Sequence, residues 1–321
     1  MIKKILLTVG LGMLISGSFA QWPSLTTDTA FIHDMCFTSK GTSLAVADGH
    51  TVKFFDVESR KLIQSFEPRH SKAILAIDLA KDSSIVVTGG KDSLVLVRNM
   101  KSGVVLREFT DHDGIITNVA LSPGGRLLAS AGTDDRVLVY DLSSGKLLYK
   151  LEDHTDDVTT VAFSPDGQWI ASAGADKTIQ LYDARQGKLL QTLKGHKSWV
   201  RDLTFTHDSR EIISVGDDHR IIRWNVEDVE NICIGKKINL CCNWLLSVDS
   251  FGQRGTYALG SQGGKIRIMS PYQIYRENLP VPVQKVLFRP NTGHYLYLAV
   301  ATRGRGVLLM KAGNMKSKER N

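Results

Sequence analysis

The sequence predicts an all-β fold, a β-propeller of seven four-stranded antiparallel blades. Three sets of residues recur along the chain, and the members of each set are spaced by 42 residues. The sets are the histidines His70, His112, His154 and His196, the aspartates Asp92, Asp134, Asp176 and Asp218, and the hydroxyl residues Thr88, Ser130, Ser172 and Ser214. Because one unit of this length cannot bury its apolar faces alone, such a period indicates a solenoid or a propeller.

Each unit contains four stretches that alternate between apolar and polar residues. In the unit that follows His154, residues 158–174 (VTTVAFSPDGQWIASAG) predict two strands joined by a tight hairpin at SPDG. Residues 178–183 (TIQLYD) predict the third strand and residues 189–193 (LLQTL) the fourth. The unit is therefore a four-stranded meander, and radial stacking of such meanders leaves only short, protected sheet edges.

The ends of the units carry a second set of motifs. One unit begins with Gly195-His196, and the third strands end in Tyr140-Asp141, Tyr182-Asp183 and Trp224-Asn225. These motifs resemble the WD40 repeat family, whose repeats have Gly-His near the start and Trp-Asp at the end. The resemblance is specific for residues 70–225. We expect a member of the family that is exported and of bacterial type.

Three further units follow from the same comparison. Residues 31–56 form a first repeat without the histidine and with Gly49 in the aspartate column, and residues 255–270 and 283–311 form a degenerate sixth and seventh. The seventh ends after its third strand. The family resemblance implies that residues 22–27 supply its outer strand and close the ring.

The recurring His, Ser/Thr and Asp residues could be mistaken for hydrolase triads. A triad needs an exposed nucleophile beside an oxyanion hole, and no enzyme needs four copies on one ring. The resemblance implies instead a buried chain in which Asp holds His, His bonds the hydroxyl, and the hydroxyl bonds an aromatic residue, here Tyr140, Tyr182 or Trp224. Arg98 occupies the aromatic position in the second unit. Glycine-rich nucleotide loops, zinc-protease motifs and nucleophile elbows are not found, so no catalytic residue, metal or cofactor is expected.

The surface is then the candidate for function. The resemblance implies that partners bind the top face of the ring at positions that flank the inner strand or precede the turn aspartate. The corresponding residues are Phe31, His33, Asp157, Thr159, Trp199, Arg201, Asp217, Gln284 and Arg303. Trp and Arg are enriched at binding hot spots, which favours Trp199 and Arg201, although packing of Trp199 on the neighbouring blade is an equal alternative.

Residues 1–20 have the pattern of a secretory signal peptide. Lys3 and Lys4 precede an apolar run over residues 5–15, and small residues lead to a cleavage site between Ala20 and Gln21. The run is short for a bilayer span, and an uncleaved anchor is the alternative. We expect a mature, exported protein in the periplasm or at the cell envelope, with the propeller over residues 21–312 and a disordered basic tail over residues 313–321.

The net charge bears on the class of partner, and the cysteines bear on disulfide and metal binding. The formal net charge of +7 is modest, and export argues against nucleic acid, which would favour a basic face with interleaved aromatics. An oxidising compartment permits one disulfide from Cys233 to Cys241 or Cys242. Three cysteines without neighbouring ligands at metal spacing do not predict a zinc site.

The sequence therefore predicts a non-catalytic scaffold that binds a protein or peptide partner on the top face of the propeller. Two alternatives stay open, because a fold does not determine a function. One is a structural subunit of an envelope or secretion assembly. The other is a hydrolase with its site in the central channel, which would need several polar groups that converge on the ring axis.

Overall fold

The computed structural model describes Leu25 and residues 32–226, 244–252, 256–269, 274–290, 295–303 and 306–314. The predicted signal peptide, the cleavage site, Phe31, the three candidate cysteines for the one predicted disulfide and residues 315–321 lie outside the described residues. All regular elements in the described part of the chain are β-strands.

The strands form seven antiparallel meanders, which confirms the predicted all-β propeller. Five sheets have four strands, and blades five and seven have three within the described ranges. Blades one to four consist of β1 (Ile32–Phe37), β2 (Ser43–Asp48), β3 (Thr51–Asp56), β4 (Leu62–Ser65), β5 (Ile74–Leu79), β6 (Ile85–Gly90), β7 (Val95–Asn99), β8 (Val105–Phe109), β9 (Ile116–Leu121), β10 (Leu127–Gly132), β11 (Val137–Asp141), β12 (Lys146–Leu151), β13 (Val158–Phe163), β14 (Trp169–Gly174), β15 (Thr178–Asp183) and β16 (Leu189–Lys194). Blades five to seven consist of β17 (Val200–Phe205), β18 (Glu211–Gly216), β19 (Ile221–Asn225), β20 (Leu245–Phe251), β21 (Thr256–Ser261), β22 (Lys265–Met269), β23 (Ile274–Asn278), β24 (Val283–Phe288), β25 (Tyr295–Thr302) and β26 (Gly306–Asn314).

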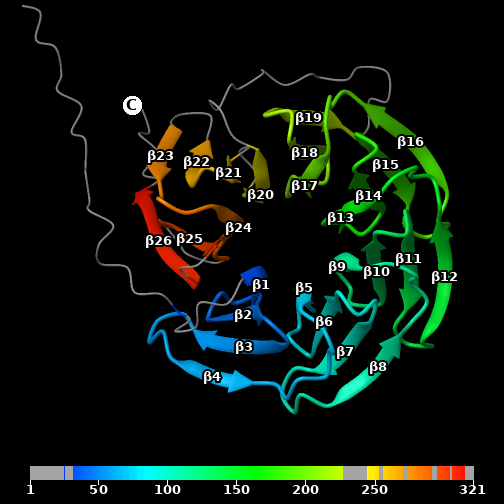
Figure 1. The fold of residues 1–321 in the computed structure, drawn as a ribbon, viewed down its shortest axis with the longest axis horizontal. Coiled ribbons are helices and arrows are strands. Elements are labelled where there is room, and N and C mark those ends of the chain that lie inside the picture. The colour runs from blue at the N-terminus through cyan, green and yellow to red at the C-terminus, as the bar shows by residue number, and fades with distance from the viewer. Residues whose placement is uncertain are drawn as a thin grey trace, which may run out of the picture.

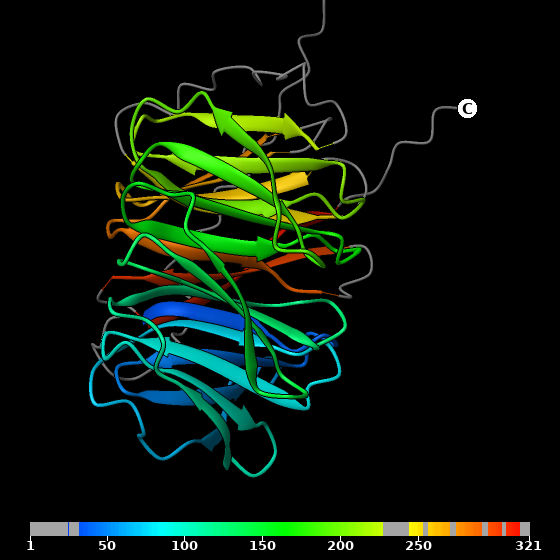
Figure 2. The same cartoon turned by 90° about the vertical axis from the view of Figure 1, so that its right-hand side faces the viewer.

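The blades surround a central axis (Figure 1). The first strand of every blade faces this axis, and β4, β8, β12 and β16 lie at the circumference. Figure 2 shows the same ring from its edge, with the blades in one layer. The inner strands of the first five blades begin 42 residues apart, at Ile32, Ile74, Ile116, Val158 and Val200. The next two begin at Leu245 and Val283, so the regular period ends with blade five.

The hydrophobic core lies between the blades. Ala171 and Ala173 of β14 pack in one cluster with Val200 and Leu203 of the next inner strand. Second strands such as β14 are buried along nearly their whole length because both of their faces are covered. Small residues let the sheets approach closely: a Cβ on Gly89 would lie 2.3 Å from the side chain of Ile116 in the next blade.

The two ends of the propeller meet in blade seven. The backbone N–H of Leu25 donates a hydrogen bond to the carbonyl of Val307 on β26, with an N···O distance of 3.0 Å. Leu25 also packs in one cluster with Ile32 of β1 and Ala299 of β25. The chain that precedes blade one thus contacts the outermost described strand of blade seven.

Candidate functional site

The propeller has two different faces. On the top face lie the segments that lead into the inner strands, such as Trp199, and the turns between second and third strands, such as residues 217–220. On the bottom face lie the turns between first and second strands, such as residues 164–168. The central channel joins the two faces.

The repeated polar residues form one arrangement in blades two to five. Nδ1 of each histidine lies 2.8–3.0 Å from a carboxylate oxygen of the aspartate, in the pairs His70–Asp92, His112–Asp134, His154–Asp176 and His196–Asp218. Nε2 lies 2.7–2.9 Å from the hydroxyl of the third residue, which is Thr88, Ser130, Ser172 or Ser214. The aspartate also accepts a hydrogen bond from the N–H that follows the histidine, as from Thr155 to Asp176 at 3.2 Å. Each carboxylate therefore fastens the top turn to the start of its own blade.

The aromatic end of this network differs between blades. In blade five, Nε1 of Trp224 donates to the Ser214 hydroxyl over 2.8 Å. In blades three and four, the hydroxyls of Tyr140 and Tyr182 are buried without a hydrogen bond of normal geometry, and burial raises the pKa of both tyrosines well above the ordinary value. Arg98 in blade two leaves the network, because its Nη1 donates to the Glu67 carbonyl at 2.9 Å.

The burial of this network determines its chemistry. The four hydroxyl residues have at most 1% of their surface exposed, so no substrate can reach the oxygen that a triad mechanism would use as the nucleophile. Burial alone would raise the pKa of Asp176, but hydrogen bonds from His154 and Thr178 lower it to about 2. The aspartate stays ionised and keeps the imidazole in place. The network is a structural one.

A cluster of aromatic and charged residues lies on the top face of blades five and six. Trp199 and Trp244 are 38% and 43% exposed. The guanidinium carbon of Arg201 lies 4.6 Å from the ring centre of Trp199 and 5.9 Å from that of Trp244. Asp217 holds the guanidinium with two hydrogen bonds, from Nε at 2.8 Å and from Nη2 at 2.5 Å. We call Trp199, Arg201, Asp217 and Trp244 the tryptophan site.

Trp244 was not among the residues predicted from the sequence. The family positions were not transferred to blade six because that repeat is divergent. The signal is nevertheless local: Trp244 directly precedes Leu245, the first residue of an inner strand, as Trp199 directly precedes Val200. A tryptophan at the same position of two consecutive blades marks one continuous surface.

The other predicted top-face residues fall into two groups. Asp157 lies in blade four, and its carboxylate is close to those of Asp135 and Asp156. The hydroxyl of Thr159 donates to the carbonyls of Ala173 at 2.9 Å and Val200 at 2.6 Å, so it bridges blades four and five.

The second group lies on other blades. His33 is partly buried on β1, Gln284 is partly buried on β24, and Arg303 is exposed after β25. Burial and the charge of Lys91 lower the pKa of His33. These three residues belong to blades one and seven, so the structure does not bring them into the tryptophan site.

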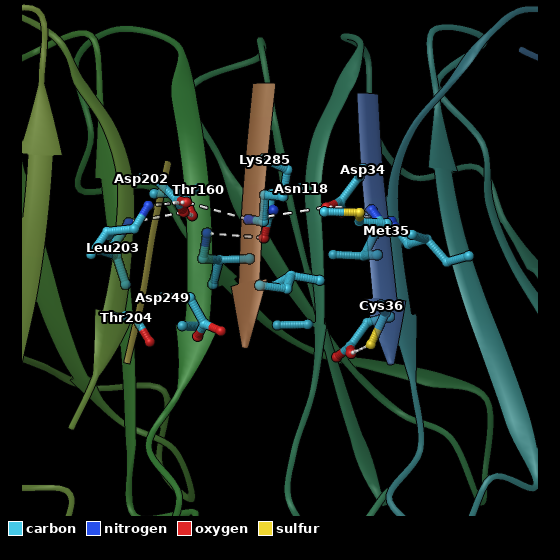
Figure 3. A pocket seen from close by; sticks show the side chains of 18 of the residues that line it. Asp34, Met35, Cys36, Asn118, Thr160, Asp202, Leu203, Thr204, Asp249 and Lys285 are labelled. Carbon is cyan, nitrogen blue, oxygen red and sulfur yellow. Dashed lines mark hydrogen bonds and ion pairs between the residues drawn. The ribbon is translucent and has the colours of Figure 1, made fainter. Parts of the chain in front are cut away.

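The central channel contains a cavity of about 240 Å³ that the inner strands surround. Figure 3 shows Lys285 between Asp202 and Asp34, with Asp249, Thr204 and Cys36 further along the channel. Nζ of Lys285 lies 3.3 Å from Oδ2 of Asp202 and 4.0 Å from Oδ1 of Asp34. Burial alone would lower the pKa of Lys285, but these two carboxylates raise it above its ordinary value. The sequence analysis assigned none of these residues to a site.

The polar side chains of the channel connect each blade to the next. Five of them accept a hydrogen bond from a backbone N–H of the following inner strand, namely Asp34 from Ile77 at 3.0 Å, Asp78 from Leu121 at 2.7 Å, Asn118 from Val161 at 3.3 Å, Asp202 from Val248 at 3.0 Å and Asp249 from Phe288 at 2.8 Å. The hydroxyl of Thr160 donates to Asp202 at 3.4 Å, and Lys285 reaches back to blade one. These contacts link all seven inner strands into a closed circle.

Acid–base groups in the channel have shifted pKa values. Burial raises the pKa of Asp78 and of Asp249 to about 6. The thiol of Cys36 lies 3.5 Å from Asp78, and burial followed by the charge of Asp78 raises its pKa well above the ordinary value. The thiol therefore remains protonated at neutral pH and is a poor nucleophile.

A second cavity, of about 640 Å³, opens at the bottom face. It shares Asp78, Leu121 and Phe163 with the channel, and the bottom turns of blades two to five line the rest. Its polar residues include His207 and Asp208, which the sequence analysis assigned to no site.

Comparison with known families fits this geometry. The model of the WD domain, G-beta repeat, matches residues 60–99, 103–141, 145–183 and 187–225. The chain belongs to the WD40 repeat family. Each matched segment begins with the outer strand of one blade and ends with the third strand of the next, as residues 60–99 do with β4 to β7. The repeats of this WD40 protein therefore overlap adjacent blades. The outer strand predicted for blade seven at residues 22–27 lies outside the described residues, except for Leu25.

WD40 propellers are in general protein-interaction scaffolds and are typically non-catalytic. Within the described ranges, no helix has the length and apolar character of a membrane span.

Proposed function

We propose that this WD40 propeller is a non-catalytic scaffold that binds a protein or peptide partner on the top face of blades four to six. The observation that carries the proposal is the exposure of Trp199 and Trp244, whose rings both lie near a fixed Arg201. An indole offers a large apolar surface with a polar edge, which is why tryptophan is enriched at binding hot spots.

The site is already organised for binding. Asp217 fixes the guanidinium of Arg201 with two hydrogen bonds, and the guanidinium in turn lies over the ring of Trp199. Side chains that are ordered before binding lose little conformational entropy when the partner arrives. Arg201 thus supports the tryptophans, in addition to any contact that it makes with the partner.

The test begins with identification of the partner by affinity purification of the tagged chain from its native envelope after gentle crosslinking. Binding is then compared for Trp199→Ala, Trp244→Ala and the bottom-face control His207→Ala. We expect each tryptophan variant to raise Kd about thirtyfold, the effect of a hot spot worth about 2 kcal/mol, at an unchanged melting temperature. Unchanged Kd values for both tryptophan variants would move the interface to another face.

Arg201→Ala serves as a second probe with a different signature. This variant breaks the ion pair between Arg201 and Asp217, whose side chains are 28% and 10% exposed. We therefore expect this variant to lose binding and also some stability, whereas Trp244→Ala loses binding alone.

We also propose that the scaffold works in the periplasm or at the cell envelope. The support is the pattern of residues 1–20, in which two lysines precede an apolar run and small residues follow it, as in a secretory signal peptide. Cell fractionation and N-terminal sequencing test it: the exported chain should begin at Gln21, and a cytoplasmic chain that still begins at Met1 would contradict the proposal.

The two alternatives predict different results. A structural subunit of an envelope or secretion assembly would elute with its partners in one stable complex during size-exclusion chromatography, whereas a transient scaffold would elute alone. A channel hydrolase would lose an activity in the Asp249→Asn variant without a change in stability. Because Asp249 accepts a hydrogen bond from Phe288 of the next blade, we expect this variant to alter stability instead.

A further inference from the structure

Negative charge is concentrated beside the tryptophan site. One oxygen each from Asp135, Asp156 and Asp157 lies within 4.8 Å of the other two. Arg136, the next residue along the chain from Asp135, is paired elsewhere, with Asp113 and Glu152 at 3.1 Å each. We call Asp135, Asp156 and Asp157 the acidic group.

The acidic group and the tryptophan site form one surface. Asp157 and Trp199 occupy the same position in consecutive blades, directly before β13 and β17. The hydrogen bond from Thr159 to the Val200 carbonyl, 2.6 Å long, holds these two inner strands side by side.

The position directly before the inner strand continues this surface over four consecutive blades. Ile115 in blade three is 37% exposed, Asp157 follows in blade four, and the two exposed tryptophans follow in blades five and six. The top face therefore presents, in order around the ring, an apolar residue, an acidic group and an aromatic pair.

The charge of the acidic group is opposite in sign to the net charge of the chain. The sequence carries a formal charge of +7, but the acidic group adds three negative charges where Arg201 is already neutralised by Asp217. Burial, followed by the charges of Asp156 and Asp135, raises the pKa of Asp157, because like charges at this distance repel one another. A positive group placed among them relieves this repulsion.

We propose that this surface binds a peptide segment in which a basic side chain lies at the acidic group and a neighbouring apolar side chain packs on Trp199 and Trp244. Charge complementarity selects the basic residue, and the exposed indole faces favour both apolar groups and cations. An acidic or phosphorylated segment would meet like charge at the same place. This inference rests on the proposed function and adds the chemical class of the partner.

The experiment uses a displayed library of random dodecapeptides, selected on the full mature chain. We expect the selected peptides to be enriched in Lys or Arg next to apolar residues. The best synthetic peptide is then titrated against the triple variant Asp135→Asn, Asp156→Asn and Asp157→Asn, which keeps the side-chain volumes and removes the charges. The matched control is the pair Asp166→Asn and Asp208→Asn on the bottom face.

We expect the triple variant to weaken peptide binding at least tenfold and the bottom-face pair to leave it unchanged. Binding to the wild-type chain should also weaken as salt is raised, since exposed charges are screened. The melting temperature of the triple variant should equal or exceed that of the wild type, because repulsion is removed.

Failure of this inference can be told apart from failure of the proposed function. Selection of peptides without basic residues, failure to select any peptide, or equal binding by the triple variant would overturn the inference. The proposed function survives those results if Trp199→Ala and Trp244→Ala still lose the native partner. If both tryptophan variants keep the native partner, both proposals fall.

Discussion

Replacing Lys285 by Met should destabilise the propeller more than any change at an exposed lysine. Nζ of Lys285 lies 3.3 Å from Asp202 and 4.0 Å from Asp34, and the two carboxylates are 7% and 10% exposed. The variant leaves both buried carboxylates without their cation and removes the contact between blades seven and one. Breaking a buried ion pair by removing one partner typically costs about 3–5 kcal/mol.

The assay is thermal unfolding followed by circular dichroism. At roughly 2–4 °C per kcal/mol for a domain of this size, we expect the melting temperature to fall by roughly 6–20 °C. Lys72→Met, at an exposed position of the top face, is the control and should change it by less than about 2 °C. Adding Asp34→Asn and Asp202→Asn to Lys285→Met should recover part of the loss. A melting temperature for Lys285→Met equal to that of the control would refute the account of the channel as a circle of contacts between blades.

Three further predictions concern stability. Asp176→Ala leaves His154 without its buried partner and should cost about 1–3 kcal/mol, with effects of equal size at Asp134 and Asp218 in urea unfolding; loss of a catalytic activity at unchanged stability would contradict the structural role. Deletion of residues 21–29 removes the contact between Leu25 and Val307 and should sharply lower the melting temperature, whereas an unchanged value would show that the ring closes in another way. Because burial raises the pKa of Asp78 and Asp249 to about 6, each of these two carboxylates binds more protons in the folded than in the unfolded chain between pH 4 and 6. Each should therefore contribute up to about 3 kcal/mol more stability as pH falls through this window, whereas Asp176, with its pKa of about 2, should lose its contribution below pH 4. A difference in urea midpoint between the wild type and the Asp78→Asn, Asp249→Asn variant that is the same at pH 6 and pH 4 would contradict this.

The sequence predicts the fold well where the repeat is regular. The inner strands of the first five blades begin 42 residues apart, so the period alone locates them. The spacing changes before Leu245 and Val283, which is why blade six was recognised only from its second strand onward and why Trp244 was missed. Trp244 holds the same place relative to its inner strand as Trp199, but the unequal spacing prevents the sequence period from locating it.

The channel could not be predicted in the same way. Asp34, Asn118 and Asp202 occupy one position of the inner strand, and Ala76 and Lys285 occupy the same position in other blades. A sequence period reveals only positions at which the same residue type recurs. At this position of the inner strand, the residue type changes from blade to blade. The pairing of Lys285 with Asp202 also spans 83 residues. The pairing of Lys285 with Asp34 joins blades seven and one, which only closure of the ring brings together.

The residues of the top face could be predicted in part from the sequence. The family positions led to Trp199, Arg201 and Asp217, which the structure places in direct contact. They gave no sign that Thr159 bridges blades four and five through the Val200 carbonyl. Contacts within the protein depend on side-chain direction across blades, which a list of positions does not contain.

The central claim is that the partner binds the top face at blades four to six. The most direct test places the photocrosslinking residue p-benzoylphenylalanine either at position 262 on the top face or at position 207 on the bottom face. Gln262 is exposed, and its backbone N–H donates a hydrogen bond to the Trp244 carbonyl at 3.0 Å, so position 262 lies beside the tryptophan site. Irradiation of cells that produce each variant should crosslink one partner from position 262 and none from position 207. Crosslinks from position 207 alone would contradict the claim.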